Sequence, residues 1–295
     1  MERTVLGKTG IEVSRLCFGA LTLGPLQANF LDTAQFYQNY PHLRCAQKLV
    51  GDELTIASKT YAYTRDAAIA AVEEARHAID RDVIDIFMLH EQESEHTFRG
   101  HAPALAALYD LKAKGVIRAV GASMHHIAAV RAATRLGLDV IHPLINVAGL
   151  GIVDGTRAEM EEALLQAHNA GIGIYTMKSL GGGNLFSRAQ ECFDYALAQP
   201  FADSIAVGMQ SIEEIDANVH YFEHQSFSQE DQEELQKKER RILIEDWCSG
   251  CGACCDACSQ KALHLQDGHA VCDPSRCILC GYCSGHCPMW SIKII

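Results

Sequence analysis

Short apolar runs rich in β-branched residues alternate along the chain with stretches in which apolar residues recur at helical spacing. Each run has the length of one buried strand, and the Ala- and Glu-rich stretches between them have the length of helices. The predicted strands are 15–19, 29–32, 54–58, 83–89, 117–122, 140–146, 172–177 and 204–207. The predicted helices are 66–79, 102–114, 126–136, 157–169, 188–199 and 212–222. Eight strands with intervening helices favour a (β/α)8 barrel over an open doubly wound sheet.

Two further segments flank this pattern. Residues 6–11 contain two glycines and predict a small hairpin that caps the bottom of the barrel. Ser228 and Asp231 have the spacing of a helix-capping pair and open a charged helix predicted over 229–241. This helix is expected to link a barrel domain, residues 1–225, to a second domain, residues 226–295.

One connection in the predicted barrel is unusually short. About ten residues separate the first strand from the second, whereas a parallel crossover needs a dozen or more, normally with a helix. The stretch 40–50 is also brief for a full barrel helix. We therefore expect the first barrel helix to be missing, or residues 20–29 to form an irregular connection.

The composition narrows the class of protein. The chain has 25 basic and 37 acidic residues, and a net charge of −12 argues against nucleic acid or an anionic membrane as a partner. No apolar run approaches the roughly 20 residues that span a bilayer, and the N-terminus lacks the apolar core of a signal peptide. Thirteen cysteines in such a chain point to metal thiolates in a reducing cytoplasm instead of disulfides.

Eight of these cysteines form two runs of identical spacing, Cys-x2-Cys-x2-Cys-x3-Cys, and Pro288 follows the second run. This spacing is typical of bacterial ferredoxins, in which the fourth cysteine of each run ligates the other cluster. The ligands predicted for one [4Fe–4S] cluster are Cys248, Cys251, Cys254 and Cys287. Those predicted for the second are Cys258, Cys277, Cys280 and Cys283.

Structural zinc and disulfides are the other interpretations of these cysteines. Zinc sites usually pair two short Cys or His clusters across a finger, whereas each run here holds four cysteines. The spacing therefore favours two iron–sulfur clusters. Cys255 and Cys272 fall inside this region but outside the spacing, and we expect them not to be ligands.

Polar residues stand at the ends of three successive predicted strands. Asp32, Lys59 and His90 follow or close strands two, three and four, and Tyr37 follows Asp32 by five residues. Each residue alone has an ordinary structural interpretation, such as a solvated strand end or a buried histidine. Because the carboxyl ends of barrel strands carry the catalytic groups, the four together predict an active site.

The segments that hold these residues resemble the aldo-keto reductase family. The resemblance lies in Asp32-Thr33-Ala34-x-x-Tyr37, Ile56-Ala57-Ser58-Lys59, Asp85-Ile86-Phe87-Met88-Leu89-His90, residues 115–123 and the later Gly208…Asn218 segment. It extends from about Leu6 to Phe222. The tail is similar to a subgroup with a C-terminal ferredoxin domain that carries two [4Fe–4S] clusters.

This resemblance implies an oxidoreductase that reduces a carbonyl, or oxidises an alcohol, with NAD or NADP. Tyr37 would donate the proton, and the Lys59 ammonium would lower the pKa of that tyrosine. Asp32 would hold Lys59 in place, and His90 would orient the carbonyl by a hydrogen bond.

The nicotinamide contacts that the resemblance implies are Ser123, Asn146, Lys178, Gly208, Ser211 and Asn218. Lys178 and Gly208 lie in the loops after strands seven and eight, where such barrels usually bind phosphate. Ser211 and Glu214 also have the spacing of a capping box, an equally good explanation of Ser211. Met124 and Met177 replace an asparagine and an aromatic residue common in the family. Glu214 stands where NADP-preferring members often carry arginine, and its carboxylate would repel a 2′-phosphate.

Two functions compete at this point. The first is a carbonyl reductase of small substrates whose two clusters exchange electrons with the site or with a redox partner protein. The alternative is an electron-transfer ferredoxin module on a catalytically degenerate barrel scaffold. The four retained catalytic residue types favour the enzyme, whereas the short first crossover, Met124, Met177 and Glu214 favour the alternative.

Overall fold

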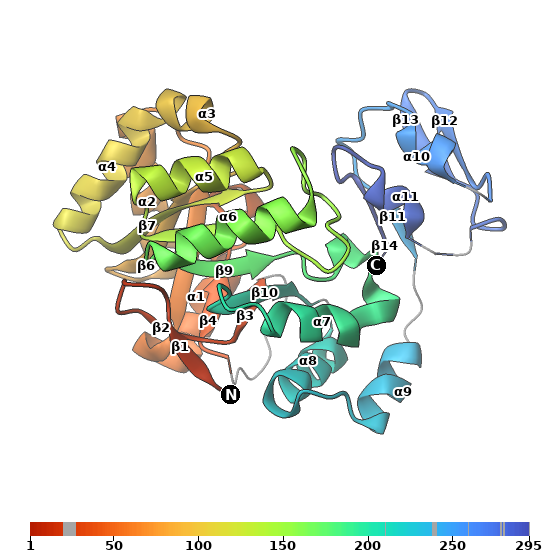
Figure 1. Ribbon diagram of the computed structural model, residues 1–295, viewed down its shortest axis with the longest axis horizontal. Helices are drawn as coiled ribbons and strands as arrows, with labels where there is room; N and C mark the ends of the chain where they lie inside the picture. Colours follow the sequence, from red (N-terminus) through yellow and green to blue (C-terminus); the bar gives the residue numbers. More distant parts are fainter. Residues whose placement is uncertain are drawn as a thin grey trace.

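The structure is a computed structural model that describes residues 1–19, 28–209, 211–237, 241–258, 260–277, 279 and 281–294. Eight parallel strands close into a barrel, each hydrogen-bonded to its two neighbours in chain order (Figure 1). The strands are β3 (Leu16–Gly19), β4 (Phe30–Asp32), β5 (Thr55–Thr60), β6 (Ile84–Leu89), β7 (Ile117–Met124), β8 (Val140–Pro143), β9 (Gly173–Met177) and β10 (Ser204–Gly208). All eight predicted strands are therefore present, and the predicted closed α/β barrel is confirmed.

Helices surround this barrel. They are α1 (Tyr40–Val50), α2 (Arg65–Ile79), α3 (Glu95–Gly100), α4 (Ala102–Ala113), α5 (Ile127–Leu136), α6 (Arg157–Asn169), α7 (Ala189–Leu197) and α8 (Ile212–His224). Local sequence sets several of their ends. The Thr156 side chain and Glu159 form a reciprocal capping box at the start of α6, and Gly137 ends α5 in the left-handed conformation.

Side-chain alternation along the strands separates two apolar layers. Ile56 and Phe87 face outward into the main core between sheet and helices. Ala57, Ile86 and Met88 face inward into the barrel. Because side chains in a strand alternate with a period of two, Lys59 shares the inward face of Ala57. The strand pattern therefore aims this lysine into the barrel.

The short hairpin at the N-terminus closes the bottom of the barrel. β1 (Arg3–Val5) pairs antiparallel with β2 (Glu12–Ser14), and the predicted segment 6–11 forms the connection between them. Leu6, Ile11 and Val13 are fully buried and pack with the inward-facing strand residues. The amino end of the barrel is thus closed by apolar side chains. Polar side chains inside the barrel are therefore expected at its carboxyl end.

Some local expectations require correction. Residues 40–50 form a full helix, α1, and are not too short for one. The acidic loop after His90 leads into α3, a short helix that the sequence pattern did not indicate. The charged helix α9 (Gln229–Lys237) ends before residue 241, since β11 (Ile242–Ile244) begins soon after. The expectation of a missing first helix falls on residues 20–27, which lie outside the described residues.

The remaining C-terminal segment consists of two similar halves. β11, α10 (Ala253–Ala257) and β12 (Leu263–Gln266) form the first, and β13 (His269–Cys272), α11 (Tyr282–Gly285) and β14 (Ile292–Ile294) form the second. β11 pairs with β14, and β12 pairs with β13, both antiparallel. A small core forms between the halves, and this segment stands beside the barrel (Figure 1).

Candidate active site

The four predicted catalytic residues lie at the carboxyl end of the barrel. Asp32 is the last residue of β4, Lys59 lies in β5, and His90 directly follows β6. Tyr37 ends η1 (Gln35–Tyr37), the short 3-10 turn after β4. The structure therefore brings together four residues that lie up to 58 positions apart in the chain, from 32 to 90.

Lys59 and Asp32 form a buried ion pair. Lys59 Nζ donates to Asp32 Oδ2 at 2.6 Å and to the Thr33 carbonyl at 2.8 Å, and both side chains are almost fully buried. Burial raises the pKa of Asp32, but the nearby charges and hydrogen bonds, led by Lys59, outweigh it, so the net direction is downward. For Lys59, burial lowers the pKa and the Asp32 charge more than restores it. Both groups are therefore charged at neutral pH.

Tyr37 and His90 stand above this pair. The Lys59 Nζ lies 5.6 Å from the centre of the Tyr37 ring, and the Tyr37 and His90 rings are 5.9 Å apart. Burial raises the pKa of Tyr37, Asp32 and Glu91 raise it further, and the Lys59 charge opposes them. Lys59 thus acts in the expected direction, but burial is the larger effect. The phenol therefore keeps its proton at neutral pH.

Ser123 fixes the orientation of His90. Its Oγ lies 2.8 Å from His90 Nδ1 and accepts the Glu91 backbone N–H at 2.9 Å. Burial, followed by the Lys59 charge, lowers the pKa of His90 to about 3, so the ring is neutral. Since Ser123 Oγ already accepts from Glu91, its own hydroxyl hydrogen is available for Nδ1. The complementary assignment puts the imidazole proton on Nε2, where it can be donated to a carbonyl.

Two further residues, which sequence reasoning missed, support Asp32: Tyr175 bonds to it directly, and His142 packs against Tyr175. The Tyr175 hydroxyl, on β9, donates to Asp32 Oδ1 at 2.7 Å. His142, on β8, stacks on Tyr175 with ring centres 3.9 Å apart and donates from Nδ1 to the Tyr175 carbonyl at 2.7 Å. Burial lowers the pKa of His142 to about 4, so its approach to Asp32 is not an ion pair at neutral pH. Asp32 thereby receives one donor on each oxygen.

The predicted nicotinamide contacts fall into two groups. Ser123 is buried beside His90, and Asn146 is buried with its side-chain nitrogen bonded to the carbonyls of Leu150, at 2.9 Å, and Lys178, at 3.3 Å. Gly208 ends β10, and Ser211 is the N-cap of α8, where it accepts the Glu214 N–H at 3.4 Å. Asn218 is buried on α8. The capping interpretation of Ser211 is therefore present in the structure.

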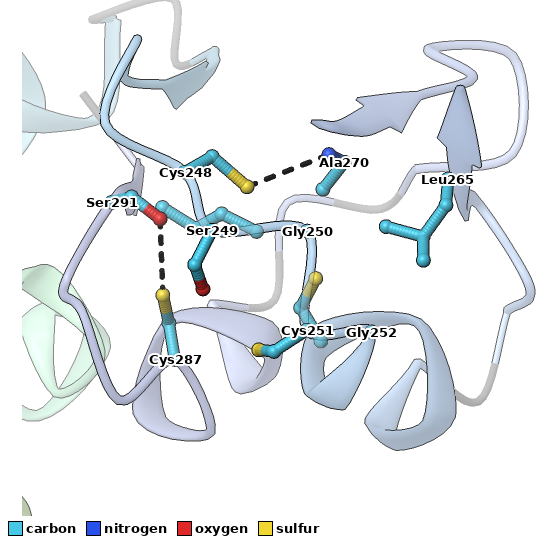
Figure 2. Close-up of a pocket in the computed structure, with 11 residues that line it drawn as sticks. Cys248, Ser249, Gly250, Cys251, Gly252, Leu265, Ala270, Cys287 and Ser291 are labelled. Carbon is cyan, nitrogen blue, oxygen red and sulfur yellow. Dashed lines mark hydrogen bonds between the residues drawn. The ribbon is translucent and has the colours of Figure 1, made fainter. Parts of the chain in front are cut away.

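The cysteines of the predicted first cluster surround one hollow. Cys248, Cys251, Cys254 and Cys287 line it, together with small apolar residues, and three of them are labelled in Figure 2. The Ala270 N–H points to Cys248 Sγ at 3.5 Å, and the Ser291 hydroxyl lies 3.2 Å from Cys287 Sγ. Hydrogen bonds of this kind stabilise thiolate charge. The fold thus places Cys287, from the second run, at the same hollow as three cysteines of the first run.

The second set is described in part. Cys280 lies outside the described residues, whereas the pKa of Cys272 is raised to about 12 by burial and then by the adjacent thiols of Cys277, Cys283 and Cys258. Of these three, Cys277 also shares a side-chain hydrogen bond with Cys272. Cys255 similarly lies beside Cys254, with the sulfurs 3.9 Å apart. Neither Cys255 nor Cys272 belongs to the spaced pattern, and Cys255 adjoins Cys254 in the sequence itself.

In the described parts of the chain, no group of three or more His, Cys, Asp and Glu side chains is close enough to hold a single metal ion. A four-iron cluster requires a wider ring of thiolates than one ion does, because iron and sulfide occupy its centre. A ring of four cysteines around a hollow fits that requirement.

A sequence model of the aldo/keto reductase family matches residues 25–192, which is more than half of the chain. The chain belongs to the aldo/keto reductase family. The matched region contains Asp32, Tyr37, Lys59 and His90, and the members of the family are oxidoreductases.

Solved aldo-keto reductases share the fold of this one. The holo form of an enzyme from Bacillus halodurans is 19% identical, with a TM-score of 0.65, over 80% of this chain and 96% of the other. A Pseudomonas aeruginosa protein described as an aldo-keto reductase is 21% identical, with a TM-score of 0.60, over 70% and 88%. No curated protein matches the chain. Identities this low establish the common barrel.

None of the helices in the described ranges has the length and apolar character needed to cross a membrane.

The contact between Ser123 and His90 leads to a testable expectation for this aldo/keto reductase. Replacing Ser123 with alanine removes the hydroxyl that fixes His90, so the ring can turn or change tautomer. We expect kcat/KM for carbonyl reduction to fall about tenfold, in line with the loss of about one hydrogen bond. Steady-state kinetics would measure it, with Ser123→Thr, which keeps the hydroxyl, as the matched control. Equal losses in both variants would contradict the orienting role.

Tyr175→Phe tests the support of Asp32. The change removes a hydrogen bond to a buried carboxylate, and we expect the free energy of unfolding to fall by about 1.5–3 kcal/mol. Urea denaturation would measure it, and Tyr63→Phe, at a tyrosine that is 66% exposed, removes the same atom without a buried partner. Similar stability in the two variants would show that Tyr175 is not a significant donor to Asp32.

The buried neutral histidines predict a pH dependence of stability. His90 and His142 have folded-state pKa values of about 3 and about 4, below the unfolded value near 6.5. Between these limits the unfolded chain binds more protons, so acid favours unfolding. We expect the free energy of unfolding to decrease below pH 6.5, by about 1.4 kcal/mol per pH unit for each histidine. Urea titrations between pH 7 and 5 would measure this slope. A flat profile would contradict burial of the neutral rings.

Proposed function

We propose that this chain reduces a carbonyl compound, or oxidises the corresponding alcohol, with a nicotinamide cofactor. The observation that carries the proposal is the placement of a protonated phenol, Tyr37, beside the neutral His90 and above the Lys59–Asp32 ion pair. Together these groups form one proton-donating and orienting site at the carboxyl end of the barrel.

The residues divide the work of the reaction. When bound, NAD(P)H supplies the hydride that reduces the carbonyl carbon. Tyr37 gives its phenolic proton to the carbonyl oxygen, while the Lys59 ammonium stabilises the phenolate that forms. His90 donates from Nε2 to the same oxygen and fixes its position. Asp32, held by Lys59 and Tyr175, keeps the ammonium charged and in place.

The cofactor would lie across the loops that follow β7 to β10. We propose Ser123, Asn146, Lys178, Gly208, Ser211 and Asn218 as its contacts, with Ser123 also orienting His90. Glu213 and Glu214 both lie in the first turn of α8. Their charges complement the helix dipole and oppose an added phosphate there, which favours NAD over NADP.

We also propose that residues 226–295 form a ferredoxin-like domain joined to an aldo-keto-reductase barrel, residues 1–225. Cys248, Cys251, Cys254 and Cys287 would hold one [4Fe–4S] cluster, and Cys258, Cys277, Cys280 and Cys283 the other. The hollow with four cysteines and the hydrogen-bonded sulfurs of Cys248 and Cys258 support this assignment. When bound, such clusters carry single electrons, for exchange with a redox partner protein.

A reducing cytoplasm is the compartment that suits these thiols. The twelve cysteines in the described residues form no disulfide with one another, and this includes the neighbours Cys254 and Cys255. A catalytically degenerate barrel remains the competing interpretation of the same chain. The complete set of contacts around Lys59 favours the enzyme, since a buried ion pair of this kind is costly to retain without use.

Anaerobic calorimetric titration of the iron-replete protein with NADH and with NADPH tests the proposal. We expect micromolar binding of one or both, tighter for NADH. Binding of neither, with both clusters intact by absorption spectroscopy, would overturn the reductase and leave an electron-transfer protein on a barrel scaffold.

A further inference from the structure

A tryptophan of the C-terminal segment reaches into the mouth of the barrel. Trp290 lies three residues after Cys287, and its indole packs between Gly151, in the loop after β8, and Gly182, in the loop after β9. A Cβ at either glycine would lie 2.5 Å from a carbon of the Trp290 ring. Only residues without a side chain can form this slot, so the indole is closely fitted to the barrel.

Lys178 is held against that indole. Its Nζ lies 3.9 Å from the centre of the Trp290 ring, and on another side it lies 3.2 Å from His125 Nε2. Burial and then the Lys178 charge lower the pKa of His125 to about 3, so this neutral ring accepts a hydrogen from the ammonium. The backbone of Lys178 is left-handed, with φ of 59°, a conformation that is uncommon for residues other than glycine.

The ammonium of Lys178 has no carboxylate partner in the described part of the chain, since no ion pair within 4 Å involves it. Burial lowers its pKa to about 8, with Glu91 opposing this fall. Glu91 accepts a hydrogen bond from the Tyr61 hydroxyl at 2.5 Å instead of pairing with the lysine. A partly desolvated cation with two neutral partners keeps one donor for a third group.

Lys178 also stands in the right place to act on substrate. It directly follows β9, which lies opposite β5, the strand of Lys59, in the closed ring. The positive charge of Lys178 also contributes to the lowered pKa of His90. A molecule whose carbonyl met Tyr37 and His90 and whose far end extended across the ring toward β9 would reach Lys178.

We propose that Lys178, held between Trp290 and His125, binds the carboxylate of an anionic carbonyl substrate. The inference rests on the proposed carbonyl reductase and narrows its substrates to carboxylated aldehydes and ketones. Trp290 serves as a positioning residue, because its ring fixes the ammonium without competing for the anion. The C-terminal segment thus completes the substrate site of the barrel.

Paired substrates test this assignment. 4-Carboxybenzaldehyde and its methyl ester, methyl 4-formylbenzoate, present the same aldehyde with and without a carboxylate. For the full-length, cluster-loaded protein we expect KM to be at least about tenfold lower for the acid than for the ester. Lys178→Met should abolish that preference: KM for the acid should rise to that for the ester, whereas any change caused by the loss of its proposed cofactor contact should be the same for both substrates. Trp290→Leu should weaken it in the same direction.

The matched control is Lys293→Met. Lys293 pairs with Glu245 at 2.6 Å in the C-terminal segment, so its loss removes one positive charge near the mouth without removing the Lys178 contact. We expect this variant to retain the preference for the acid. If Lys293→Met lost the preference for the acid as completely as Lys178→Met, the preference would come from the overall positive charge of this region, and the proposal would be overturned.

A binding experiment separates failure of this inference from failure of the reductase. Calorimetry would compare 4-(hydroxymethyl)benzoate with its methyl ester on the wild type and on Lys178→Met. Tighter binding of the carboxylate that is lost in Lys178→Met supports the site even if neither aldehyde is reduced. Two results would overturn the carboxylate site but leave the proposed reductase intact. One is reduction of both aldehydes with equal KM, and the other is a Lys178→Met defect confined to NADH or NADPH binding.

Discussion

Tyr37→Phe is expected to reduce kcat for carbonyl reduction by about 10²- to 10⁴-fold, the usual contribution of a positioned general acid. The change removes only the phenolic hydroxyl and leaves the ring contact with His90, so KM should change little. Tyr37 is half-exposed, and its ring centre lies 5.6 Å from the Lys59 ammonium. Cluster absorption should remain that of the wild type, because the cysteines lie in another part of the chain.

Tyr61→Phe provides the sharpest comparison for this prediction. The Tyr61 ring lies 4.7 Å from that of His90, so it is the other phenol beside the proposed carbonyl site. However, its hydroxyl hydrogen is committed to Glu91, and burial together with that carboxylate holds its pKa well above the usual value. We therefore expect a much smaller loss than in Tyr37→Phe. A larger loss in Tyr61→Phe would reassign the proton donor.

Cys254→Ala is expected to halve the iron content, from about eight to about four irons per chain, because it removes one of four ligands of a single cluster. The neighbouring Cys255→Ala should retain all the iron, although the two sulfurs are 3.9 Å apart. Iron and acid-labile sulfide analysis after anaerobic reconstitution would measure both. Electron paramagnetic resonance of the reduced protein should show one cluster in Cys254→Ala and two interacting clusters in Cys255→Ala.

Two outcomes would contradict the assignment of these ligands. Equal iron loss in both cysteine variants would mean that the spacing does not select Cys254 as a ligand. Bound zinc in place of iron and sulfide would replace the clusters with a structural metal site. Because Cys254 also belongs to the small core of this segment, a thermal melt of each variant is required as a check on folding.

The sequence predicted the parts of this molecule that depend on local pattern. Strand and helix periodicity gave the eight strands of the barrel, because alternation in and out of a core is imposed by backbone geometry. The same periodicity, with the rule that catalytic groups follow parallel strands, located Asp32, Lys59 and His90. The cysteine spacing indicated a shared ligand set because three thiols on one tight loop are a local feature. Helix α3 escaped detection because six residues are too few for a periodic signal.

Only the tertiary structure decided which side chains support these residues. Tyr175 meets Asp32 across 143 positions of the chain, because closure of the barrel brings inward-facing side chains of β9 and β4 together in its interior. No spacing rule could pair Ser123 with His90, since the contact depends on the register of β6 and β7. Trp290 reaches Lys178 through a slot made by two glycines in separate loops. The periodicity of the sequence thus determined the barrel and the positions of Asp32, Lys59 and His90 at the ends of its strands. Closure of the barrel and packing between distant segments determined which side chains hydrogen-bond to these residues and orient them.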